Sequence, residues 1–291
     1  MPDIKTVGIF SKPDVPAAAG LVPKLIDWLR GRGLRVRCDA ETASYAGKCD
    51  GLPRPDVPEG CDLVIVLGGD GTLLSAARAI SGREIPLFPV NLGGLGFLTA
   101  ITIDEVFPEL ERAFRGEHRV GLRKMLEVEL VRQGQMVAHY EALNDAVINK
   151  ASLARMIDLD AYVDEMFVCA YKVDGLIVAT PTGSTAYSLS AGGPIIFPSV
   201  AAFCITPICP HMLTNRPLVI RDEGVIAIRL HSEDVEVHIT LDGQRGLPMT
   251  PEDTVTVTRS PRTLRLVKAA GRDYYEVLRT KLKWGEASRR R

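Results

Sequence analysis

An apolar run that stops at a glycine-rich turn is the feature that most constrains the fold. Leu63–Leu67 (Leu-Val-Ile-Val-Leu) has β-branched residues and no polar break, which predicts a strand buried on both faces. The turn Gly68–Thr72 (Gly-Gly-Asp-Gly-Thr) follows at once, and then a helical pattern with Leu73, Leu74 and Ala77 on one side. Strand, glycine turn and helix together aim backbone N–H groups at an anion. We therefore expect an α/β sheet with a ligand at the carboxyl end of this strand.

A second glycine loop comes soon after the first. Asn91–Phe97 (Asn-Leu-Gly-Gly-Leu-Gly-Phe) follows another short apolar stretch, Ile85–Val90. Glycine accepts positive φ and lets a phosphate approach the backbone, so the two loops are predicted to wall one phosphate site. Neither a P-loop nor a Gly-x-Gly-x-x-Gly fingerprint is present. The alternative is two tight turns, but a plain turn does not need the carboxylate of Asp70.

The first part of the chain reads as alternating strands and helices. A strand at Thr6–Phe10, a helix at Ala17–Arg32 and a strand at Leu34–Cys38 predict a parallel sheet. Ala40–Gly60 is rich in Gly, Pro, Asp and Ala without a period, which predicts a surface loop. Ile103–Phe114 is predicted to be a helix that begins near Asp104.

From Arg123 onward the period changes to two. Short strands with turn residues between them predict an all-β second domain. We expect an α/β domain over 1–120, a β-rich domain over 121–273, and a closing helix at 274–284 that packs back on the first domain. The predicted strands are Glu127–Val131, Met136–Tyr140, Ala146–Asn149, Ile157–Val163, Phe167–Lys172, Val225–Leu230, Val235–Leu241, Thr254–Thr258 and Leu264–Lys268.

The stretch Asp174–Pro194 is the second informative region. An apolar strand at Leu176–Val178 is broken by Pro181, and Ser184 or Thr185 is predicted to cap a helix that runs through Leu189. Tyr187 is the one aromatic residue there, and its ring suits stacking on a purine. Taken alone, a structural turn with a core tyrosine is an equal alternative.

Several motifs occur in one order and carry a family resemblance. Gly-Gly-Asp-Gly-Thr alone is shared with diacylglycerol and sphingosine kinases and, loosely, with phosphofructokinases. The further motifs are Asn144-Asp145, Asp174-Gly175, Thr182 to Tyr187, Pro207 to His211, Arg216-Pro217 and Asp242 to Gln244. Together they make the chain similar to the NAD kinase family, bacterial type. Two departures are Asp145, where Glu is more frequent, and Ala179, where Ser is common.

The resemblance implies an activity and a set of site residues. It implies transfer of a phosphoryl group from ATP to the adenosine ribose 2′-hydroxyl of NAD, which gives NADP, with Asp70 as the catalytic base. The implied NAD-binding residues are Gly71, Phe97, Asn144, Asp145, Asp174, Thr182, Thr185, Ala186, Tyr187, Ser190 and Gln244. The implied phosphate-binding residues are Gly68, Gly69, Gly71, Thr72, Gly93 and Gly94. A homodimer or homotetramer built on the β-rich domain is also implied.

No cluster of carboxylates in the sequence makes an all-protein Mg²⁺ site, so the divalent ion is expected to arrive with ATP. Two alternative functions are a lipid kinase of the same superfold and a non-catalytic NAD(P)-binding sensor. Asn144-Asp145 with Thr185 to Tyr187 suits a nucleoside better than an acyl chain, and a sensor does not need Asp70 as a base.

Composition excludes several classes of partner. The chain has 291 residues and a formal net charge of -1, so no strong field favours nucleic acid or an anionic membrane. No apolar run is long enough to span a bilayer. The 6 cysteines form no Cys-x-x-Cys pair, and we expect them to be reduced and packed in a cytoplasmic protein.

Overall fold

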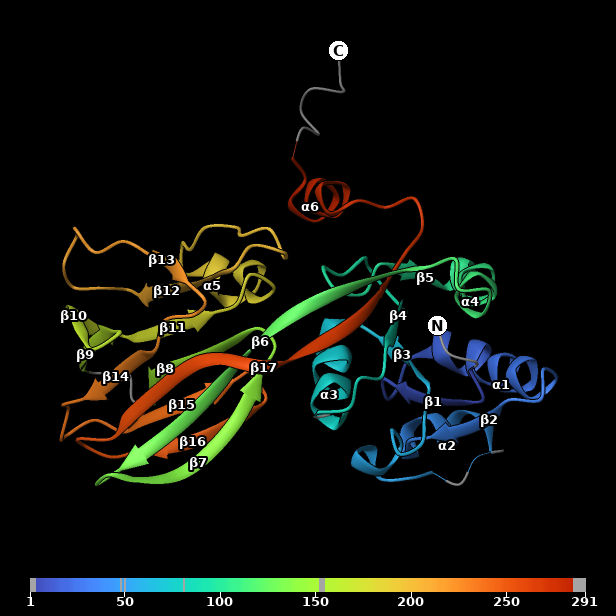
Figure 1. The fold of residues 1–291 in the computed structure, drawn as a ribbon, viewed down its shortest axis with the longest axis horizontal. Coiled ribbons are helices and arrows are strands. Elements are labelled where there is room, and N and C mark those ends of the chain that lie inside the picture. The colour runs from blue at the N-terminus through green and yellow to red at the C-terminus, as the bar shows by residue number, and fades with distance from the viewer. Residues whose placement is uncertain (1–3, 48, 50, 81, 152–154, 285–291) are drawn as a thin grey trace, which may run out of the picture. The chain divides into compact units, whose positions relative to one another are not determined.

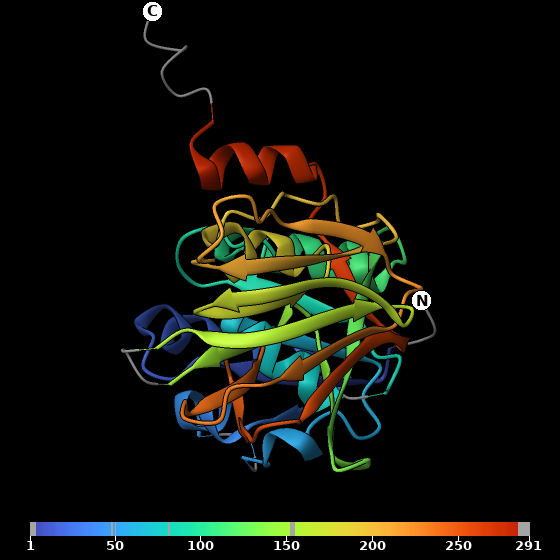
Figure 2. The same ribbon diagram turned by 90° about the vertical axis from the view of Figure 1, so that its left-hand side faces the viewer.

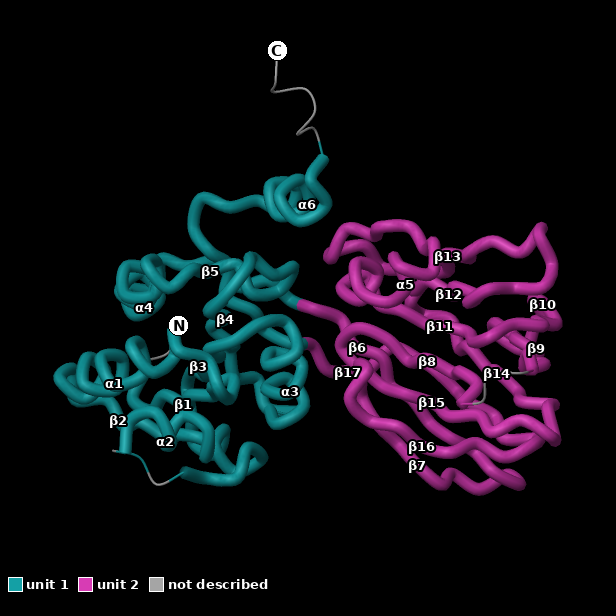
Figure 3. The backbone as a smooth tube through the Cα atoms, turned by 180° about the vertical axis from the view of Figure 1, so that it is seen from behind, with its two compact units in different colours: residues 1–122, 264–291 teal, residues 123–263 magenta. Residues whose placement is uncertain are grey.

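The computed structural model describes residues 4–47, 49, 51–80, 82–151 and 155–284. The chain divides into two compact units (Figure 3). The first unit combines residues 1–122 with 264–291, and the second contains residues 123–263. Each unit is described by itself below, with the element labels of Figure 1.

The first unit is built on a parallel sheet. Its strand order is β17-β4-β3-β1-β2, and the short β5 pairs with β4. Because β1 lies between β2 and β3, the chain moves to one side of β1 and then to the other, which creates a switch point between β1 and β3. The strands are β1 (Thr6–Ser11), β2 (Arg35–Cys38), β3 (Leu63–Gly68), β4 (Leu87–Asn91), β5 (Ile101–Thr102) and the end of β17 (Thr254–Lys268).

Both faces of this sheet are buried, as the apolar run predicted. All six residues of β3 are buried. Ile65 and Leu67 belong to one core cluster with Leu25 of α1 (Pro16–Arg30) and Leu110 of α4 (Val106–Phe114). Val64 and Val66, on the opposite face, are equally inaccessible. The predicted strand with two covered faces is confirmed.

The segment predicted as a surface loop, Ala40–Gly60, contains regular structure instead. It forms the helix α2 (Ala40–Ala46) and a 3₁₀ turn at Arg54–Asp56. The carboxylate of Asp39 accepts the Thr42 N–H at 2.8 Å and so caps α2. The Arg54 guanidinium donates to Asp39 Oδ2 at 2.9 Å and to the Ser11 carbonyl at 2.8 Å. The loop prediction was wrong because these local polar contacts, and not an apolar period, stabilise the segment.

The expected set of reduced cysteines also needs a correction. Cys38 and Cys49 form a disulfide, with their Cα atoms 5.9 Å apart. The pairing could not be predicted because the two residues have no recognised spacing. The end of β2 brings Cys38 close to Cys49, which follows α2. Cys61 and Cys204 are free and buried, Cys169 is partly buried, and Cys209 is exposed.

The remaining helices of the first unit follow the sequence closely. The predicted helix over Ile103–Phe114 begins as a 3₁₀ turn (Ile103–Glu105) and continues as α4. Its N-cap is Thr102, which forms a capping box with Glu105 and lies two positions before the expected Asp104. The last helix is α6 (Tyr274–Leu282), capped by Asp273. Across the described ranges, no helix combines the length and the apolar character that a bilayer crossing needs.

The second unit is an antiparallel β-sandwich, and its strands face the viewer in Figure 2. One sheet has the order β13-β12-β11-β8-β15-β16, and the other has β10-β9-β14-β17-β6-β7. The strands are β6 (Arg119–Arg132), β7 (Gln135–Ala142), β8 (Asp145–Lys150), β9 (Ile157–Val163), β10 (Met166–Val173), β11 (Gly175–Ala179), β12 (Ala202–Ile208), β13 (Leu218–Arg221), β14 (Ile226–Leu230), β15 (Val237–Leu241) and β16 (Arg245–Met249).

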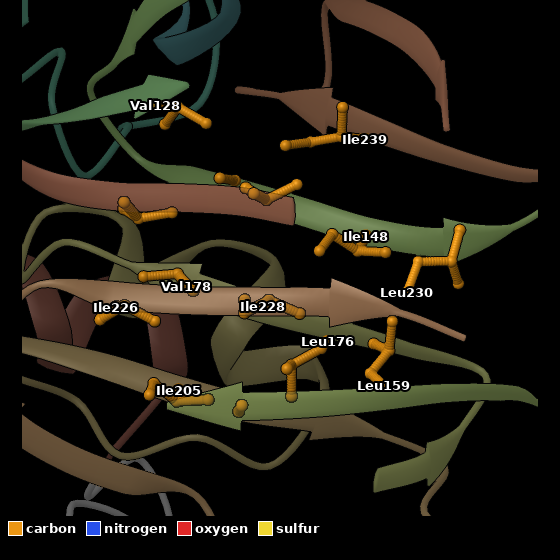
Figure 4. Packing of buried hydrophobic residues seen from close by; sticks show 14 of the residues in the cluster. Val128, Ile148, Leu159, Leu176, Val178, Ile205, Ile226, Ile228, Leu230 and Ile239 are labelled. Atoms are coloured by element: carbon orange, nitrogen blue, oxygen red, sulfur yellow. The ribbon is translucent and has the colours of Figure 1, made fainter. Parts of the chain in front are cut away.

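The core of this unit lies between its two sheets. Ile148 and Leu176 of one sheet pack in the same cluster as Leu159 and Ile228 of the other (Figure 4). All four are at most 1 % exposed. Leu159 and Ile228 lie in strands whose buried residues alternate with less buried ones, in agreement with the predicted two-residue period. The predicted combination of an α/β unit and a β-rich unit is therefore confirmed.

Two long strands contain the unit boundaries. The chain leaves the first unit within β6, after Leu122, and returns within β17, at Leu264. The second unit thus ends ten residues before the expected limit at 273. The reason is that Thr254–Thr258 and Leu264–Lys268, expected as separate strands, form one strand whose Leu266 pairs with Leu87 of β4.

Candidate active site

The glycine turn of the first unit joins β3 to α3 (Asp70–Ile80), so Asp70 is the first residue of a helix. Gly68 cannot be replaced without rearrangement, because a Cβ there would lie 2.3 Å from Thr72 Oγ1. Gly69 faces open space. The turn therefore combines one tightly packed glycine, one accessible backbone position and one carboxylate, whose negative charge the helix N-terminus stabilises.

Asp70 binds the second glycine loop through both of its carboxylate oxygens. Oδ1 accepts the N–H groups of Leu98 and Thr99, each at 3.1 Å, and the Thr99 hydroxyl at 3.0 Å. Oδ2 accepts the Phe97 N–H at 3.0 Å. The two glycine loops follow the paired strands β3 and β4, and Asp70 joins them directly.

Two buried polar residues support this carboxylate: Thr99, which contacts it, and Asn91, which contacts Thr99. Thr99 is fully buried and Asn91 is 5 % exposed. The Asn91 side-chain amide donates to Thr99 Oγ1 at 2.9 Å, and Asn91 Oδ1 accepts the Gly93 N–H at 2.7 Å. Gly96 covers the pair closely, because a Cβ there would lie 2.2 Å from Asp70 Oδ1 and 2.3 Å from Thr99 Oγ1.

The other residues with an implied phosphate role lie at the accessible side of the two loops. Gly71, Gly93 and Gly94 are exposed. A Cβ on Gly93 or Gly94 would meet nothing within 4 Å, so a ligand can approach their backbone. Phe97 is partly buried, and the Lys281 ammonium of α6 lies 5.7 Å from the centroid of its ring.

The second unit contains a cavity of about 290 Å³. Four residues with an implied NAD-binding role line it: Asn144, Asp145, Ala186 and Tyr187. The other lining residues are Val147, Asn149, Thr240, Asp242 and Gly243. Tyr187 is 45 % exposed, so part of its aromatic ring is accessible to a ligand. Asn149 Oδ1 is buried without a hydrogen-bond partner within the described chain, which leaves an acceptor for a ligand.

The Asn144-Asp145 segment is fixed from three sides. The Asp242 carboxylate accepts the N–H groups of Asn144 at 2.7 Å and Asp145 at 3.3 Å. Thr180 donates its N–H to the Asn144 carbonyl at 2.9 Å. Gly183 packs so closely that a Cβ would lie 2.0 Å from the same carbonyl oxygen. All these contacts are made by backbone groups of the segment. The side chains of Asn144 and Asp145, which line the cavity, take no part in them.

Asp145 has an altered acidity. Its side chain is 4 % exposed. Burial, followed by the negative charge of Asp242, raises its pKa from 3.8 to about 7. Asp145 is therefore a carboxyl group that exchanges its proton near neutral pH, which makes it able to donate as well as accept a hydrogen bond to a ligand hydroxyl.

The remaining implied NAD-binding residues do not line the cavity. Asp174 forms an ion pair with Lys150 at 2.6 Å, and the Thr185 hydroxyl donates to the Thr182 carbonyl at 3.2 Å. Thr182 Oγ1 is buried without a partner in the described part of the chain. Ser190 and Gln244 are exposed.

The predicted helix cap at Ser184 or Thr185 was wrong. The helix here is the short α5 (Tyr187–Ser190), and its N-cap residue is Ala186, which has no capping side chain. Ser184 instead donates to the Pro181 carbonyl at 2.6 Å and accepts the Ile196 N–H at 2.9 Å. Its hydroxyl thus joins the turn at Pro181 to Ile196, which lies 12 residues further along the chain.

Sequence reasoning missed three residues that shape the sites. Asn91 and Thr99 have no catalytic signature, and their position beside a glycine loop was the one available signal. Asp242 belonged to a recognised Asp-Gly-Gln motif, but its partners are 97 to 99 residues away. Asp242 has a positive φ of 51°, and the turn in which it lies directs its carboxylate toward the backbone of residues 143–145.

No three His, Cys, Asp or Glu side chains converge as metal ligands anywhere within the described ranges. The first unit therefore has a carboxylate between two open glycine loops, and the second has a polar cavity beside an accessible aromatic ring. These are the features of a nucleotide-binding protein that handles phosphate groups.

Comparison with known proteins narrows this class. The ATP-NAD kinase N-terminal domain matches residues 7–118, and the ATP-NAD kinase C-terminal domain matches residues 143–269. NAD kinase of Solibacter usitatus is 63% identical over 286 residues, which covers 98% of this chain and 100% of that protein. NAD kinase of Geobacter sulfurreducens is 49% identical over 283 residues, with 97% and 100% coverage. The chain belongs to the ATP-NAD kinase family.

Solved structures agree with this assignment. Yeast NADH kinase complexed with NADH superposes with a TM-score of 0.88 at 26% identity and covers 98% of this chain and 89% of that one. An NAD kinase from Archaeoglobus fulgidus in complex with ATP gives a TM-score of 0.76 at 25% identity, with 95% and 98% coverage. The two alternatives, a lipid kinase and a non-catalytic sensor, are not supported.

Proposed function

We propose that this protein is an NAD kinase that uses ATP to phosphorylate the adenosine ribose 2′-hydroxyl of NAD. The observation that carries the proposal is the position of Asp70. Its carboxylate stands at a helix N-terminus between two accessible glycine loops, and Oδ2 accepts a single hydrogen bond. Oδ1 accepts three hydrogen bonds from the described residues, so Oδ2 is the carboxylate oxygen that keeps capacity for a proton.

In the proposed reaction the ribose 2′-oxygen attacks the γ-phosphorus of ATP. The new oxygen–phosphorus bond forms while the bond between the γ-phosphorus and the β–γ bridging oxygen breaks. ADP leaves, NADP is formed, and the hydroxyl proton passes to Asp70 Oδ2. Phosphoryl transfer asks the protein mainly for positioning and for neutralisation of charge, which suits a site built from backbone N–H groups and one base.

The cavity of the second unit is the proposed site for the nucleoside part of NAD. Tyr187 is positioned to stack on a purine, and Ala186 is its neighbour in the cavity wall. Asn144 and Asp145 supply an amide and a carboxyl group that suit ribose hydroxyls. Asn149 Oδ1, buried without a partner in the described chain, adds an acceptor for an exocyclic amine or a hydroxyl.

We propose that Mg²⁺ enters as part of the ATP substrate. The motivation is that a triphosphate binds the ion through its own oxygens, while the described residues contain no group of three ligands. Mg²⁺ in the site neutralises phosphate charge during transfer. Titration of activity with Mg²⁺ at fixed ATP tests this, since activity is expected to follow the concentration of the complex and not that of the free ion.

A homodimer or homotetramer built on the β-rich unit is also proposed. Large apolar side chains are exposed on edge strands of its sheets: Met136 and Val137 on β7, Met166 and Phe167 on β10, and Leu218 and Val219 on β13. Exposed edges of this kind are commonly covered by a second copy. Light scattering that gives the mass of a monomer, together with full activity, would rule this out.

A cytoplasmic location is proposed as well, and cell fractionation tests it.

One assay tests the proposed function. The purified protein is incubated with ATP, Mg²⁺ and NAD, and the product is read with an NADP-specific dehydrogenase. NADP formation that depends on both ATP and NAD is expected. A parallel reaction with NADH measures the choice between the two acceptors. Absence of any phosphorylated dinucleotide from a folded sample, with either acceptor, overturns the proposal.

A further inference from the structure

Behind Asp70, three hydrogen bonds run in one direction through buried side chains. The Gly93 N–H donates to Asn91 Oδ1 at 2.7 Å, the Asn91 amide donates to Thr99 Oγ1 at 2.9 Å, and Thr99 Oγ1 lies 3.0 Å from Asp70 Oδ1. The Gly93 N–H is a donor only, so it requires the oxygen of the Asn91 side chain on its side. The Asn91 nitrogen must then face Thr99.

This order decides where the Thr99 proton points. A threonine hydroxyl has one proton, and it accepts through its lone pairs. Because the Asn91 amide already donates to Thr99 Oγ1, the hydroxyl proton is left for Asp70 Oδ1. Thr99 is fully buried, so no solvent competes for that proton. The Thr99 hydroxyl is therefore a fixed donor to the carboxylate.

The fixed donor distinguishes the two oxygens of Asp70. Oδ1 accepts three hydrogen bonds, from Leu98 N, Thr99 N and Thr99 Oγ1, whereas Oδ2 accepts one, from Phe97 N. With Oδ1 saturated, the carboxylate cannot rotate about its Cβ–Cγ bond without losing contacts on both oxygens. Oδ2 is consequently held as the oxygen with free capacity.

We propose that Thr99, oriented by Asn91, is a positioning residue that holds the Asp70 carboxylate with Oδ2 directed to the reacting hydroxyl. The proposal rests on the proposed function, in which Asp70 is the base. Thr99 acts through Asp70 and touches no substrate. Gly96 belongs to the same device, because a side chain at that position would collide with both Asp70 Oδ1 and Thr99 Oγ1.

Two substitutions of Thr99 test the proposal. Thr99→Val keeps the shape and removes the hydroxyl, and Thr99→Ser keeps the hydroxyl. We expect Thr99→Val to lower kcat about tenfold while KM for NAD and for ATP changes little, because an interaction that serves the reacting state is lost. Thr99→Ser is expected to retain most of the wild-type kcat. A loss that is equal in both variants contradicts a role for the hydroxyl.

A double-substitution cycle separates positioning from general structure. In an Asp70→Asn background the base is absent, so adding Thr99→Val is expected to lower kcat no further. If the two losses multiply, Thr99 does not act through Asp70 and the proposal is overturned. Thr102→Val is the matched control: its hydroxyl bonds Glu105 Oε2 at 2.8 Å in the α4 cap, so we expect a lower Tm with unchanged kcat. Circular dichroism melts of every variant confirm folding.

The same kinetic measurements separate the assignment of Asp70 as the base from the positioning role of Thr99. If Asp70→Asn and Thr99→Val both turn over like the wild type, the base assignment fails. If Asp70→Asn is slow and Thr99→Val is as fast as the wild type, the base assignment stands and the role of Thr99 fails.

Discussion

Asp145 and Asp242 place two carboxyl groups at one cavity wall, and the backbone N–H of Asp145 donates to Asp242 Oδ1 at 3.3 Å. The Asp242 carboxylate is tied to the backbone of residues 143–145 and stays in place. The pKa of the buried Asp145 is raised to about 7, so its carboxyl group is partly protonated at neutral pH. Burial, and after it the negative charge of Asp242, explains why Asp145 holds its proton more tightly than an exposed carboxyl group does.

This pair makes the stability of the protein depend on pH. The pKa of Asp145 is raised in the folded state, from 3.8 to about 7, so its contribution to stability is complete below about pH 4 and is lost as the pH rises to about 7. Asp145→Asn removes the titration. We expect the Tm of the variant to rise relative to the wild type between pH 5 and pH 8. A Tm difference that stays constant over this range contradicts the raised pKa.

Asp242 is expected to control affinity more than turnover. Asp242→Asn replaces an oxygen that accepts backbone N–H groups with an NH₂ group, which loosens the segment that carries Asn144. KM for NAD is predicted to rise about tenfold, a loss of about 1.4 kcal/mol, with kcat less affected. Steady-state kinetics with NAD as the varied substrate measure this.

Asp164 provides the control for Asp242. It has the same φ of 51°, and its carboxylate accepts the Val225 N–H at 2.9 Å in a turn that does not line the cavity. Asp164→Asn is expected to leave KM unchanged. Equal KM values for Asp242→Asn and Asp164→Asn would show that the Asp242 contacts do not serve the dinucleotide.

Gly183→Ala is expected to displace the backbone of Asn144, which lines the cavity. The added Cβ would lie 2.0 Å from the Asn144 carbonyl oxygen, so the backbone must move. We predict a loss of roughly 1–3 kcal/mol in the free energy of unfolding and a higher Kd for NAD, measured by denaturation and calorimetry. Gly246→Ala is the control, because a Cβ there meets only Thr240 Oγ1, at 3.9 Å. Similar Kd values for both variants would contradict the packing argument.

Local sequence patterns predicted the central strand, the glycine turn, the helix after it and most strands of the sandwich. The apolar run at Leu63–Leu67 and the glycines after it predicted β3, the turn and α3, because burial on both faces and backbone freedom are written in adjacent residues. The alternating period predicted most strands of the sandwich. In contrast, α2 was missed because its cap, Asp39, is a single polar residue in a segment without an apolar period.

The parts of the site that were missed depend on long-range contacts. Asp70 was identified from its turn, but its bonds to Thr99 join residues 29 positions apart, and no local pattern encodes them. The same holds for Asp242, which contacts the Asn144 segment through the pairing of β8 with β15. The identity of a catalytic residue can be read from a motif, whereas its supporting partners require the fold.

Asp70→Asn removes the proposed general base and changes little else in the side chain. The carboxamide keeps an oxygen at the Oδ1 position, where three of the four hydrogen bonds are made, and places NH₂ at the Oδ2 position, where only the hydrogen bond from the Phe97 N–H is lost. The fold is therefore expected to persist while the base is lost. General base catalysis is worth ~10²–10⁴-fold, so kcat for NADP formation is predicted to fall at least about a hundredfold.

The measurement is kcat of Asp70→Asn in the NADP assay, with the Kd for NAD determined by calorimetry on the same sample. We predict the loss of turnover together with a Kd that stays near the wild-type value or decreases, because a negative charge near the phosphates has been removed. Turnover near the wild-type rate would contradict the assignment of Asp70 as the base, and joint loss of turnover and NAD binding would show that Asp70 is a structural member of the glycine turn.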